Sequence, residues 1–435
     1  MIPSRTLVLL LIAPLCLGLA VVADASLVWP MLAVDGAIAL AAGLDAVLAR
    51  KRLITVTRSV EPGVFSLGRP NVVRLELRSR ASRPLKVALN DDLFETAEAE
   101  GLPLEVELGP RGRASVSYRV VPRRRGQYAL GDHWIRHRSP LGLWTRQLRI
   151  PARDEVRVYP DVQAVRAYDL MAKQNRENQM VRATRLRGGE SDFECLREYS
   201  RDDEYRAIDW RATASKRRLI TRQYQLERNQ SVVFALDCGR LMTARVGGLP
   251  LFDHALNSAL MLAHVAVRTG DNVGLFTFSD EVHTYVAPST GPQVARRLVQ
   301  ATFATHAELR ESNVPAAFVR VGAQLRRRSL IVLFTQVIDD TSAAELLRTV
   351  RGLHPRHLPL CVIFRDPDLE AVVRPTGGRA SEFYTAAAAA ELLAARDKLL
   401  RDLKQAGALV LDVAPKELTS SLISRYLDVK VRHLL

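Results

Sequence analysis

Two long apolar stretches near the N-terminus constrain this chain more than any other feature. Residues 6–23 and 27–49 are apolar almost throughout, and a short connector containing Asp24 separates them. Each stretch is close to the ~20 residues that cross a bilayer as an α-helix. We therefore expect a hairpin of two transmembrane helices within residues 1–52, which contacts the lipid bilayer through residues 6–49.

Basic residues flank the two stretches and indicate on which side the rest of the chain lies. Arg5 precedes the first stretch, and Arg50, Lys51 and Arg52 follow the second. Lys and Arg beside membrane helices are enriched on the cytoplasmic side. We expect both ends of the hairpin, and the bulk of the chain, on the cytoplasmic side of the cell's inner membrane.

A cleaved signal peptide is the alternative for the first stretch, because residues 23–25 (Ala-Asp-Ala) fit an A-x-A cleavage site. Cleavage would leave the second stretch as the span, with its basic end still inside. Residues 51–435 would face the cytoplasm under either interpretation, and the uncleaved hairpin is favoured.

Two acidic residues interrupt the second stretch. Asp35 lies about a third of the way along it, where a carboxylate costs ~2.5–3.5 kcal/mol on insertion scales. A single acid does not make a proton relay, so we interpret Asp35 as tilted toward the outer headgroups or protonated against the first helix. Asp45 is expected near the inner interface, where it needs no explanation.

Charge and cysteine content narrow the function classes. The chain has 435 residues, which predicts two or three domains, and its 62 Lys+Arg against 47 Asp+Glu give a net charge of +15. A basic surface suits anionic lipid, an acidic protein or nucleic acid. Because the arginines are spread along the chain, we favour lipid or protein partners and expect no nucleic acid.

The four cysteines lack metal-site spacing and indicate no disulfide framework.

Residues 53–160 predict a small antiparallel β-sandwich. Residues 73–78, 104–108 and 114–120 alternate apolar and polar side chains, as half-buried strands do, with Gly and Pro between them. Residues 139–144 (Ser-Pro-Leu-Gly-Leu-Trp) indicate a tight turn anchored by an aromatic side chain. This section contains no catalytic constellation, so a spacer or binding role is expected.

Residues 161–230 form a polar connector and then an unusual charged segment. Acids and arginines alternate densely, but aromatic side chains lie between them, which a purely solvated charge run would not carry. We interpret the segment as a surface ordered by Arg–carboxylate pairs that docks a partner. The residues predicted for partner binding are Asp192, Arg197, Glu198, Tyr199, Asp203, Arg206, Asp209 and Trp210.

A divalent-metal-dependent hydrolase is the alternative function for the same segment. Asp202, Asp203, Glu204 and Asp209 supply oxygen ligands for a metal that activates water, with Lys216 as an accompanying cation. Four acids within eight residues are common on surfaces, and neighbouring arginines compete for them, so ion pairing is favoured over hydrolysis.

Residues 231–435 alternate buried strands with helices. Runs of continuous aliphatic residues occur at 231–237, 273–278, 330–335, 358–363 and 408–413. This pattern predicts a doubly wound parallel sheet covered on both faces. Ligands bind such sheets at the carboxyl ends of the strands, where the first strand ends in Asp237.

These motifs together resemble the domain-of-unknown-function-58 family. The central motif combines residues 192–193, 196–199, 203, 206–210 and 212–214, and further matches lie at 123–128, 140–144, 156–160 and 236–242. The resemblance implies a membrane-anchored accessory protein that works beside a MoxR-type AAA+ ATPase. It also implies that the last domain is similar to a von Willebrand factor A module.

Von Willebrand A modules hold Mg²⁺ with an Asp-x-Ser-x-Ser loop, a Thr from a second loop and a late Asp. The resemblance carries the first ligand onto Asp237, but Gly239 and Leu241 replace both loop hydroxyls. Ser312 stands at the Thr position, and Thr335 begins the segment where the late Asp is expected. We therefore expect a degenerate site at Asp237 and Ser312, with Mg²⁺ doubtful and no cofactor required.

The expected architecture is a transmembrane hairpin (1–52), a β-sandwich (53–160), a charged connector (161–230) and an α/β domain (231–435). The chain contains no Walker A loop, no H-E-x-x-H motif and no G-x-S-x-G nucleophile elbow. We expect a non-enzymatic adaptor or assembly factor. A simple binder of anionic lipid or nucleic acid is a third possibility.

Overall fold

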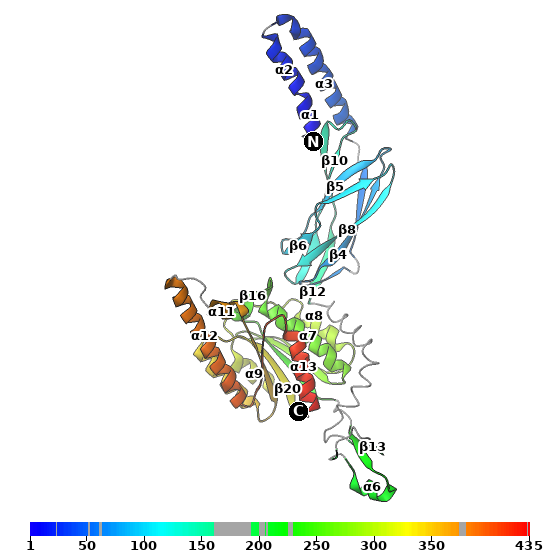
Figure 1. Cartoon of the computed structure of the whole chain (residues 1–435). Coiled ribbons are helices and arrows are strands. Elements are labelled where there is room, and N and C mark those ends of the chain that lie inside the picture. The colour runs from blue at the N-terminus through cyan, green and yellow to red at the C-terminus, as the bar shows by residue number, and fades with distance from the viewer. Residues whose placement is uncertain are drawn as a thin grey trace. The chain divides into compact units, whose positions relative to one another are not determined.

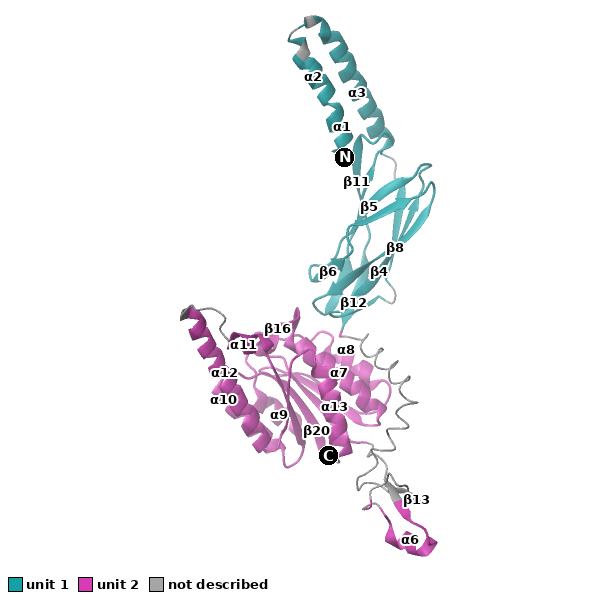
Figure 2. Ribbon diagram, in the orientation of Figure 1, with its two compact units in different colours: residues 1–159 teal, residues 160–435 magenta. Residues whose placement is uncertain are grey.

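The computed structural model describes residues 1–22, 24–50, 53–60, 63–160, 193–199, 205, 208–224, 229–373, 380–432 and 434–435. The chain divides into two compact units, Met1–Tyr159 and Pro160–Leu435 (Figure 2).

The first unit begins with three apolar helices, α1 (Arg5–Leu10), α2 (Ile12–Val21) and α3 (Val28–Leu48). Figure 1 shows α1 and α2 beside α3. Among the described residues, only α3 is long and apolar enough to cross a membrane, with 21 residues and a mean hydropathy of 1.8. The first stretch is broken at Leu11, because Pro14 lacks the N–H and crowds the carbonyl four residues earlier. The described residues thus contain one helix that could cross a membrane, and the pair of transmembrane helices stays a prediction.

Three sheets follow in the same unit, and their strands are antiparallel except for the pairing of β3 with β12. The five-stranded sheet has the order β1 (Ile2–Pro3), β11 (Trp144–Ile150), β10 (His133–Arg138), β5 (Leu85–Asp91) and β7 (Leu104–Leu108). The four-stranded sheet has the order β2 (Ile54–Ser59), β4 (Asn71–Ser79), β8 (Arg113–Pro122) and β6 (Ala97–Glu100). The three-stranded sheet has the order β3 (Val64–Ser66), β12 (Asp154–Tyr159) and β9 (Gly126–Leu130).

Strict alternation explains why these strands form layered sheets. In β4 every second side chain is buried, including Val73, Leu75 and Leu77. Leu89 of β5 and Ile135 of β10 are also fully buried and lie opposite each other in the ladder. The apolar face of each strand therefore supplies the core and the polar face meets water. The predicted antiparallel sheets are confirmed.

The turn formed by residues 139–144, which we name the junction turn, holds the C-terminal end of α3. The carboxylate of Asp45 accepts hydrogen bonds from the hydroxyl of Ser139 at 2.5 Å and from the amides of Leu141 and Leu143 at 2.9 and 3.1 Å. The indole of Trp144 donates to the carbonyl of Ala42 at 2.9 Å. Asp45 is fully buried, and its carboxylate ties the helix to the sheet, a role that the sequence pattern did not indicate.

A buried ion network joins the three sheets of this unit. Arg58 of β2 donates to Asp91 of β5 at 2.9 Å and to Asp154 of β12 at 2.8 Å. Asp91 also accepts from the hydroxyl of Tyr118 at 2.5 Å and lies 2.8 Å from Nδ1 of His133. Burial alone would raise the pKa of Asp91, but the bonds from His133 and Tyr118 and the Arg58 charge lower it.

The second unit contains a six-stranded sheet with helices on both faces (Figure 1). The strand order is β19 (Val282–Ser289), β18 (Asn272–Phe278), β15 (Ser231–Asp237), β20 (Ser329–Thr335), β21 (Leu358–Phe364) and β22 (Leu409–Val413). The pairings are parallel except at β19, which runs antiparallel to β18. Only residues 279–281 connect these two strands, which is too short for a crossover.

Each face of the sheet buries its own layer of helices. Val232, Phe234 and Leu236 pack with α7 (Leu251–Arg268), α8 (Val294–Thr302) and α13 (Leu418–Val431). Val233 and Ala235 point to the other face and pack with α9 (Val314–Gly322), α10 (Asp340–Leu353) and α12 (Ala380–Gln405). The short helix α11 (Pro367–Val372) follows β21. Both faces are covered, so continuous aliphatic strands are required.

Candidate functional site

Part of the charged segment forms a small element that we name the signature hairpin, which consists of residues 193–199, 205 and 208–224. Strand β13 (Phe193–Glu198) pairs antiparallel with β14 (Ile220–Tyr224), with Arg197 opposite Thr221 and Glu198 opposite Ile220. Glu198 lies 3.5 Å from Arg218, and both side chains are exposed. The amide of Tyr199 donates to the carbonyl of Leu219 at 2.9 Å and extends the ladder by one residue.

Helix α6 (Trp210–Lys216) lies between the two strands in sequence and is fixed by Asp209. The Asp209 carboxylate accepts from the amide of Ala212 at 2.9 Å, which caps the helix. Its own amide donates to the carbonyl of Ile220 on β14 at 2.8 Å. The hydroxyl of Thr213 accepts from the Ile220 amide at 3.0 Å. Asp209 therefore has a structural task as a helix cap.

Two aromatic side chains are exposed together on the signature hairpin. Tyr205 and Trp210 meet edge to face with ring centroids 5.5 Å apart. Tyr205 is 69% exposed and Trp210 is 55% exposed. Exposed aromatic pairs are uncommon where no partner covers them, and Tyr and Trp dominate the binding energy of protein interfaces.

The carboxyl edge of the six-stranded sheet carries the second candidate. Asp237 ends β15, Thr335 ends β20, and Ser312 lies in the loop before α9. The Asp237 carboxylate accepts from Ser312 Oγ at 2.5 Å, Thr335 Oγ1 at 2.6 Å and the amide of Gly239 at 2.8 Å. Burial raises the pKa of Asp237, and these three bonds oppose the rise.

This donor set does not fit a magnesium ion. Mg²⁺ prefers near-octahedral oxygen ligands, but the protein's own hydroxyls and an amide donate to both oxygens of Asp237. A Cβ at Gly239 would lie 1.9 Å from Ser312 Oγ, so Ser312 fills the space a side chain at 239 would need. The recess beside Asp237 has a volume of about 20 Å³, which suits about one water molecule.

Exposed charges surround this closed centre. Arg240 lies 2.5 Å from Glu311, and Arg310 lies 2.8 Å from Asp280. Hydrogen bonds from the Ser279 hydroxyl and from Arg310 lower the pKa of Asp280 to about 2. The rim is thus ionised at neutral pH, with opposite charges held side by side.

A comparison with protein-family models matches the region that contains both candidate surfaces, the signature hairpin and the carboxyl edge of the six-stranded sheet. Residues 195–381 match the family model described as "Protein of unknown function DUF58". The chain carries a DUF58 domain. This domain includes most of the signature hairpin and the carboxyl edge with Asp237, Ser312 and Thr335, so both candidate surfaces belong to it.

No curated protein matches the chain. Solved structures that resemble parts of it include the PapD-like domain 7 of human CEP192, with 17% identity, a TM-score of 0.19, and coverage of 24% of this chain and 85% of that one. The C. elegans MSP family member WR4 has 11% identity, a TM-score of 0.17, and coverage of 25% and 99%. The cupredoxin domain of amoB from Nitrosocaldus yellowstonii has 8% identity, a TM-score of 0.19, and coverage of 26% and 90%.

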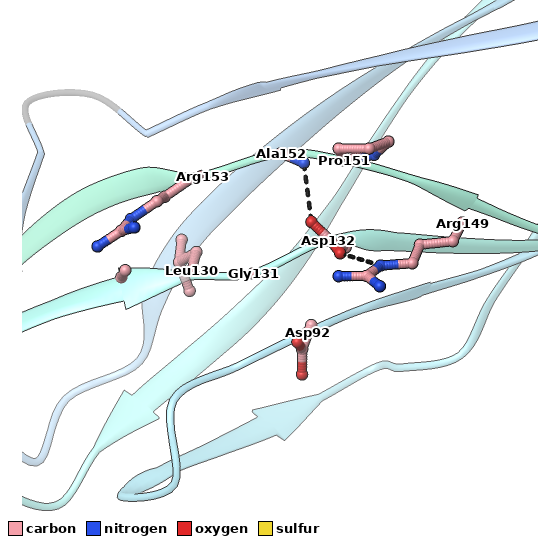
Figure 3. Close-up of a pocket in the computed structure, with 9 residues that line it drawn as sticks. Asp92, Leu130, Gly131, Asp132, Arg149, Pro151, Ala152 and Arg153 are labelled. Carbon is pink, nitrogen blue, oxygen red and sulfur yellow. Dashed lines mark hydrogen bonds and ion pairs between the residues drawn. The ribbon is translucent and has the colours of Figure 1, made fainter.

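A groove of about 540 Å³ lies in the β-rich part of the first unit, outside the DUF58 match (Figure 3). Asp132 on its wall accepts from Arg149 and from the amide of Ala152, which lowers the pKa of Asp132, the amide bond contributing most. A Cβ at Gly131 would lie 2.4 Å from Asp92 Oδ2, so glycine lets the Asp92 carboxylate approach. Asp132 is already paired with Arg149 and with the Ala152 amide, so the groove is a weaker candidate than the DUF58 surfaces.

The structure brings some predicted site residues together and does not describe others. Glu198 and Tyr199 lie at the end of β13, Asp209 and Trp210 begin α6, and the Arg197 backbone lies in β13. Asp237 and Ser312 are hydrogen-bonded to each other. Asp35 and Arg50 lie within and just after α3. The predicted residues outside the described part are Lys51, Arg52, Asp192, Asp202, Asp203, Glu204 and Arg206.

Sequence reasoning missed the role of Thr335, Tyr205 and the Arg58 network. Thr335 was expected only as a lost acidic ligand, yet it donates directly to Asp237. A signal for Arg58 existed, because it lies in phase with the buried Ile54 and Val56 along β2. A charged residue at an inward-facing strand position requires a buried partner.

Proposed function

We propose that this DUF58 protein is a membrane-anchored, non-enzymatic adaptor or assembly factor that works with a MoxR-type AAA+ ATPase. Helix α3 anchors the chain in the inner membrane, with the bulk on the cytoplasmic side, and the DUF58 domain docks the partner. The observation that carries the proposal is the exposed aromatic pair of Tyr205 and Trp210. Such a pair gives a partner a large rigid contact at low entropic cost.

A recess at the carboxyl edge supports a second point of docking. It has a volume of about 240 Å³ and lies between α10, α11 and α12, with Ile338, Leu369 and Leu392 among its lining residues. Ile338 and Leu392 are exposed apolar side chains. A volume of this size accepts one or two apolar side chains of a partner.

The chemistry of the edge favours docking over catalysis. The Asp237 carboxylate is occupied by three protein donors, so it is not free to act as a base or a metal ligand. The space beside it holds no substrate-sized molecule. The helix-covered sheet with a closed centre fits a domain similar to a von Willebrand A module that has exchanged its ion for hydrogen bonds.

Binding of a purified MoxR-type ATPase to the full-length protein in lipid nanodiscs tests the proposal. We expect Trp210→Ala to weaken the complex by ~30-fold, the equivalent of ~2 kcal/mol for an interface hot spot. Tyr384→Ala is the matched control, because Tyr384 is an aromatic residue of α12 that is 79% exposed. Equal affinity for Trp210→Ala and the unmodified protein, at unchanged thermal stability, would contradict the proposal.

The recess is tested in the same assay with Ile338→Lys, which puts a charge where an apolar side chain is expected to dock. Val319→Lys on α9 is the control, because Val319 is likewise an exposed aliphatic residue. We expect weaker binding only for Ile338→Lys. The hydrolase alternative predicts turnover of phosphodiesters by the full-length protein with Mg²⁺ or Mn²⁺, and the adaptor proposal predicts none.

A further inference from the structure

The junction turn lies at a defined depth along the membrane helix. Asp45, which accepts from the turn, is three residues before the end of α3 at Leu48, and Ala42, which accepts from Trp144, is six residues before it. At 1.5 Å per residue these positions are about 5 Å and about 9 Å inside the end of the helix. The 21 residues of α3 span about 31 Å, which matches the ~30 Å hydrocarbon core. The turn therefore contacts the helix in the outermost 5 to 9 Å of the core, just beneath the headgroups.

The hydrogen bonds of Asp45 explain why a polar turn enters this layer. A carboxylate at the edge of the core loses water and needs replacement donors. The turn supplies three of them, from the Ser139 hydroxyl and the amides of Leu141 and Leu143. If the turn separated from the helix, the Asp45 carboxylate and its three donors would lose their hydrogen bonds.

The tip of the turn has the composition of an interfacial anchor. Leu141 is 57% exposed although it is apolar, and Pro140 beside it is also exposed. Gly142 has a φ of 76°, which sharpens the turn and projects the tip. Trp144 has a half-buried ring whose N–H is bonded to the helix, and Trp is enriched at membrane interfaces.

Arginines surround the same turn. Arg83 donates to the carbonyls of Pro140 and Arg138 at 3.4 and 3.1 Å, and Arg146 donates to the carbonyl of Ala49. Arg5 follows Ser4, whose amide donates to Leu143 at 2.9 Å. The acid inside this group, Asp45, is already occupied by the turn.

We propose that the junction turn inserts at the boundary between the headgroup layer and the hydrocarbon core and that the arginines around it bind anionic phospholipid headgroups. The inference rests on the membrane anchoring in the proposed function, and it is independent of the ATPase partner. The phosphates lie just outside this boundary, where the long side chains of arginines extend toward the headgroups, and guanidinium groups bind phosphate oxygens with paired N–H donors.

Depth is tested with the full-length protein in liposomes whose lipids are brominated near the headgroup end of the acyl chains. The protein has four tryptophans, and three variants each retain one of them, with Phe at the other three positions. We expect quenching of Trp29, which lies near the start of α3, and of Trp144 in the junction turn. Trp134 is the matched control, because it is four residues from the junction end of β10 and should not be quenched.

Headgroup selectivity is tested by electron spin resonance of spin-labelled phosphatidylglycerol and phosphatidylcholine around the reconstituted protein. The double variant Arg83→Gln with Arg138→Gln should lower the preference for phosphatidylglycerol by roughly fivefold for each charge removed. The control is Arg74→Gln with Arg119→Gln, two exposed arginines of β4 and β8, which should leave the preference unchanged.

The outcomes separate the proposal from its premise. Quenching of Trp29 without Trp144 overturns the insertion of the turn and leaves the anchoring intact. Absence of quenching at both positions overturns the anchoring as well. Quenching of both with an equal lipid preference in the Arg83/Arg138 variant overturns the headgroup site.

Discussion

Ser139 donates its hydroxyl to the carboxylate of Asp45 at 2.5 Å, across 94 positions of the sequence. The bond joins a loop between two strands to the last turns of an apolar helix. Both side chains are buried, so neither is satisfied by water. Together with the bonds from the amides of Leu141 and Leu143 and from the Trp144 indole, this contact ties helix α3 to the adjoining sheet.

We predict that Asp45→Ala destabilises the first unit by ~3 kcal/mol, because one buried hydroxyl and two amides lose their acceptor. Thermal unfolding in nanodiscs measures the effect. Asp35→Ala is the control, since the structure records no hydrogen bond for this second acid of α3. A similar loss in both variants would indicate a general helix effect and contradict the prediction.

Replacing the buried arginine of the three-sheet network should cost more than replacing an exposed cation. Arg58→Met strands the buried Asp91 and is expected to cost ~3–5 kcal/mol in chemical denaturation. Lys86→Met breaks an exposed pair with Glu107 and should cost far less, because water solvates both ions. Arg58→Met combined with Asp91→Leu should recover part of the loss, whereas additive losses would argue against a coupled pair.

The raised pKa of Asp237 gives the second unit a defined pH dependence. A raised pKa in the folded state means that stability is fully present below the unfolded value of 3.8 and is lost as pH rises through the folded value. Asp237→Asn removes this loss, so its advantage over the unmodified protein should grow from pH 3 to pH 7. Denaturation midpoints across this range measure it, and a variant that is less stable at pH 7 would show that the ionised carboxylate is favourable.

Because of His137, we expect the stability of the first unit to depend on pH in the opposite direction. Burial, followed by the charges of Arg146 and Arg83, lowers its pKa below 6.5, and Nε2 has no hydrogen-bond partner among the described residues. Stability is therefore present above pH 6.5 and is lost as pH falls through the folded pKa. His137→Leu should flatten this slope between pH 7 and pH 5. His354→Leu, at an exposed position, should leave it unchanged.

The periodicity of apolar residues predicted individual strands and which of them are half-buried or fully buried. Alternation along residues 73–78 predicted a half-buried strand, which lies within β4, and the continuous aliphatic run of 231–237 predicted a buried strand, which is β15. The partners of buried polar groups could not be predicted in this way. Arg58 meets acids 33 and 96 positions away, and these separations are set by sheet topology.

The candidate site shows the same division. The exposed Trp210 and the strand-end acid Asp237 were evident from the sequence, because their residue types are unusual in those local contexts. The hydrogen bond from Thr335 to Asp237 required the two strands to be neighbours in the sheet. The ligand pattern of von Willebrand A modules places an acid near Thr335. It does not indicate that the Thr335 hydroxyl would donate directly to Asp237.

The contact between Gly239 and Ser312 limits how this loop can change over evolutionary time. Any side chain at position 239 meets Ser312 Oγ at 1.9 Å, so its cost depends on what occupies position 312. Gly239→Ser is expected to be harmful alone and tolerated only after Ser312 has become smaller or moved. The two positions are therefore epistatic, and a descendant of this sequence would need ordered, compensating substitutions to regain a hydroxyl-rich loop.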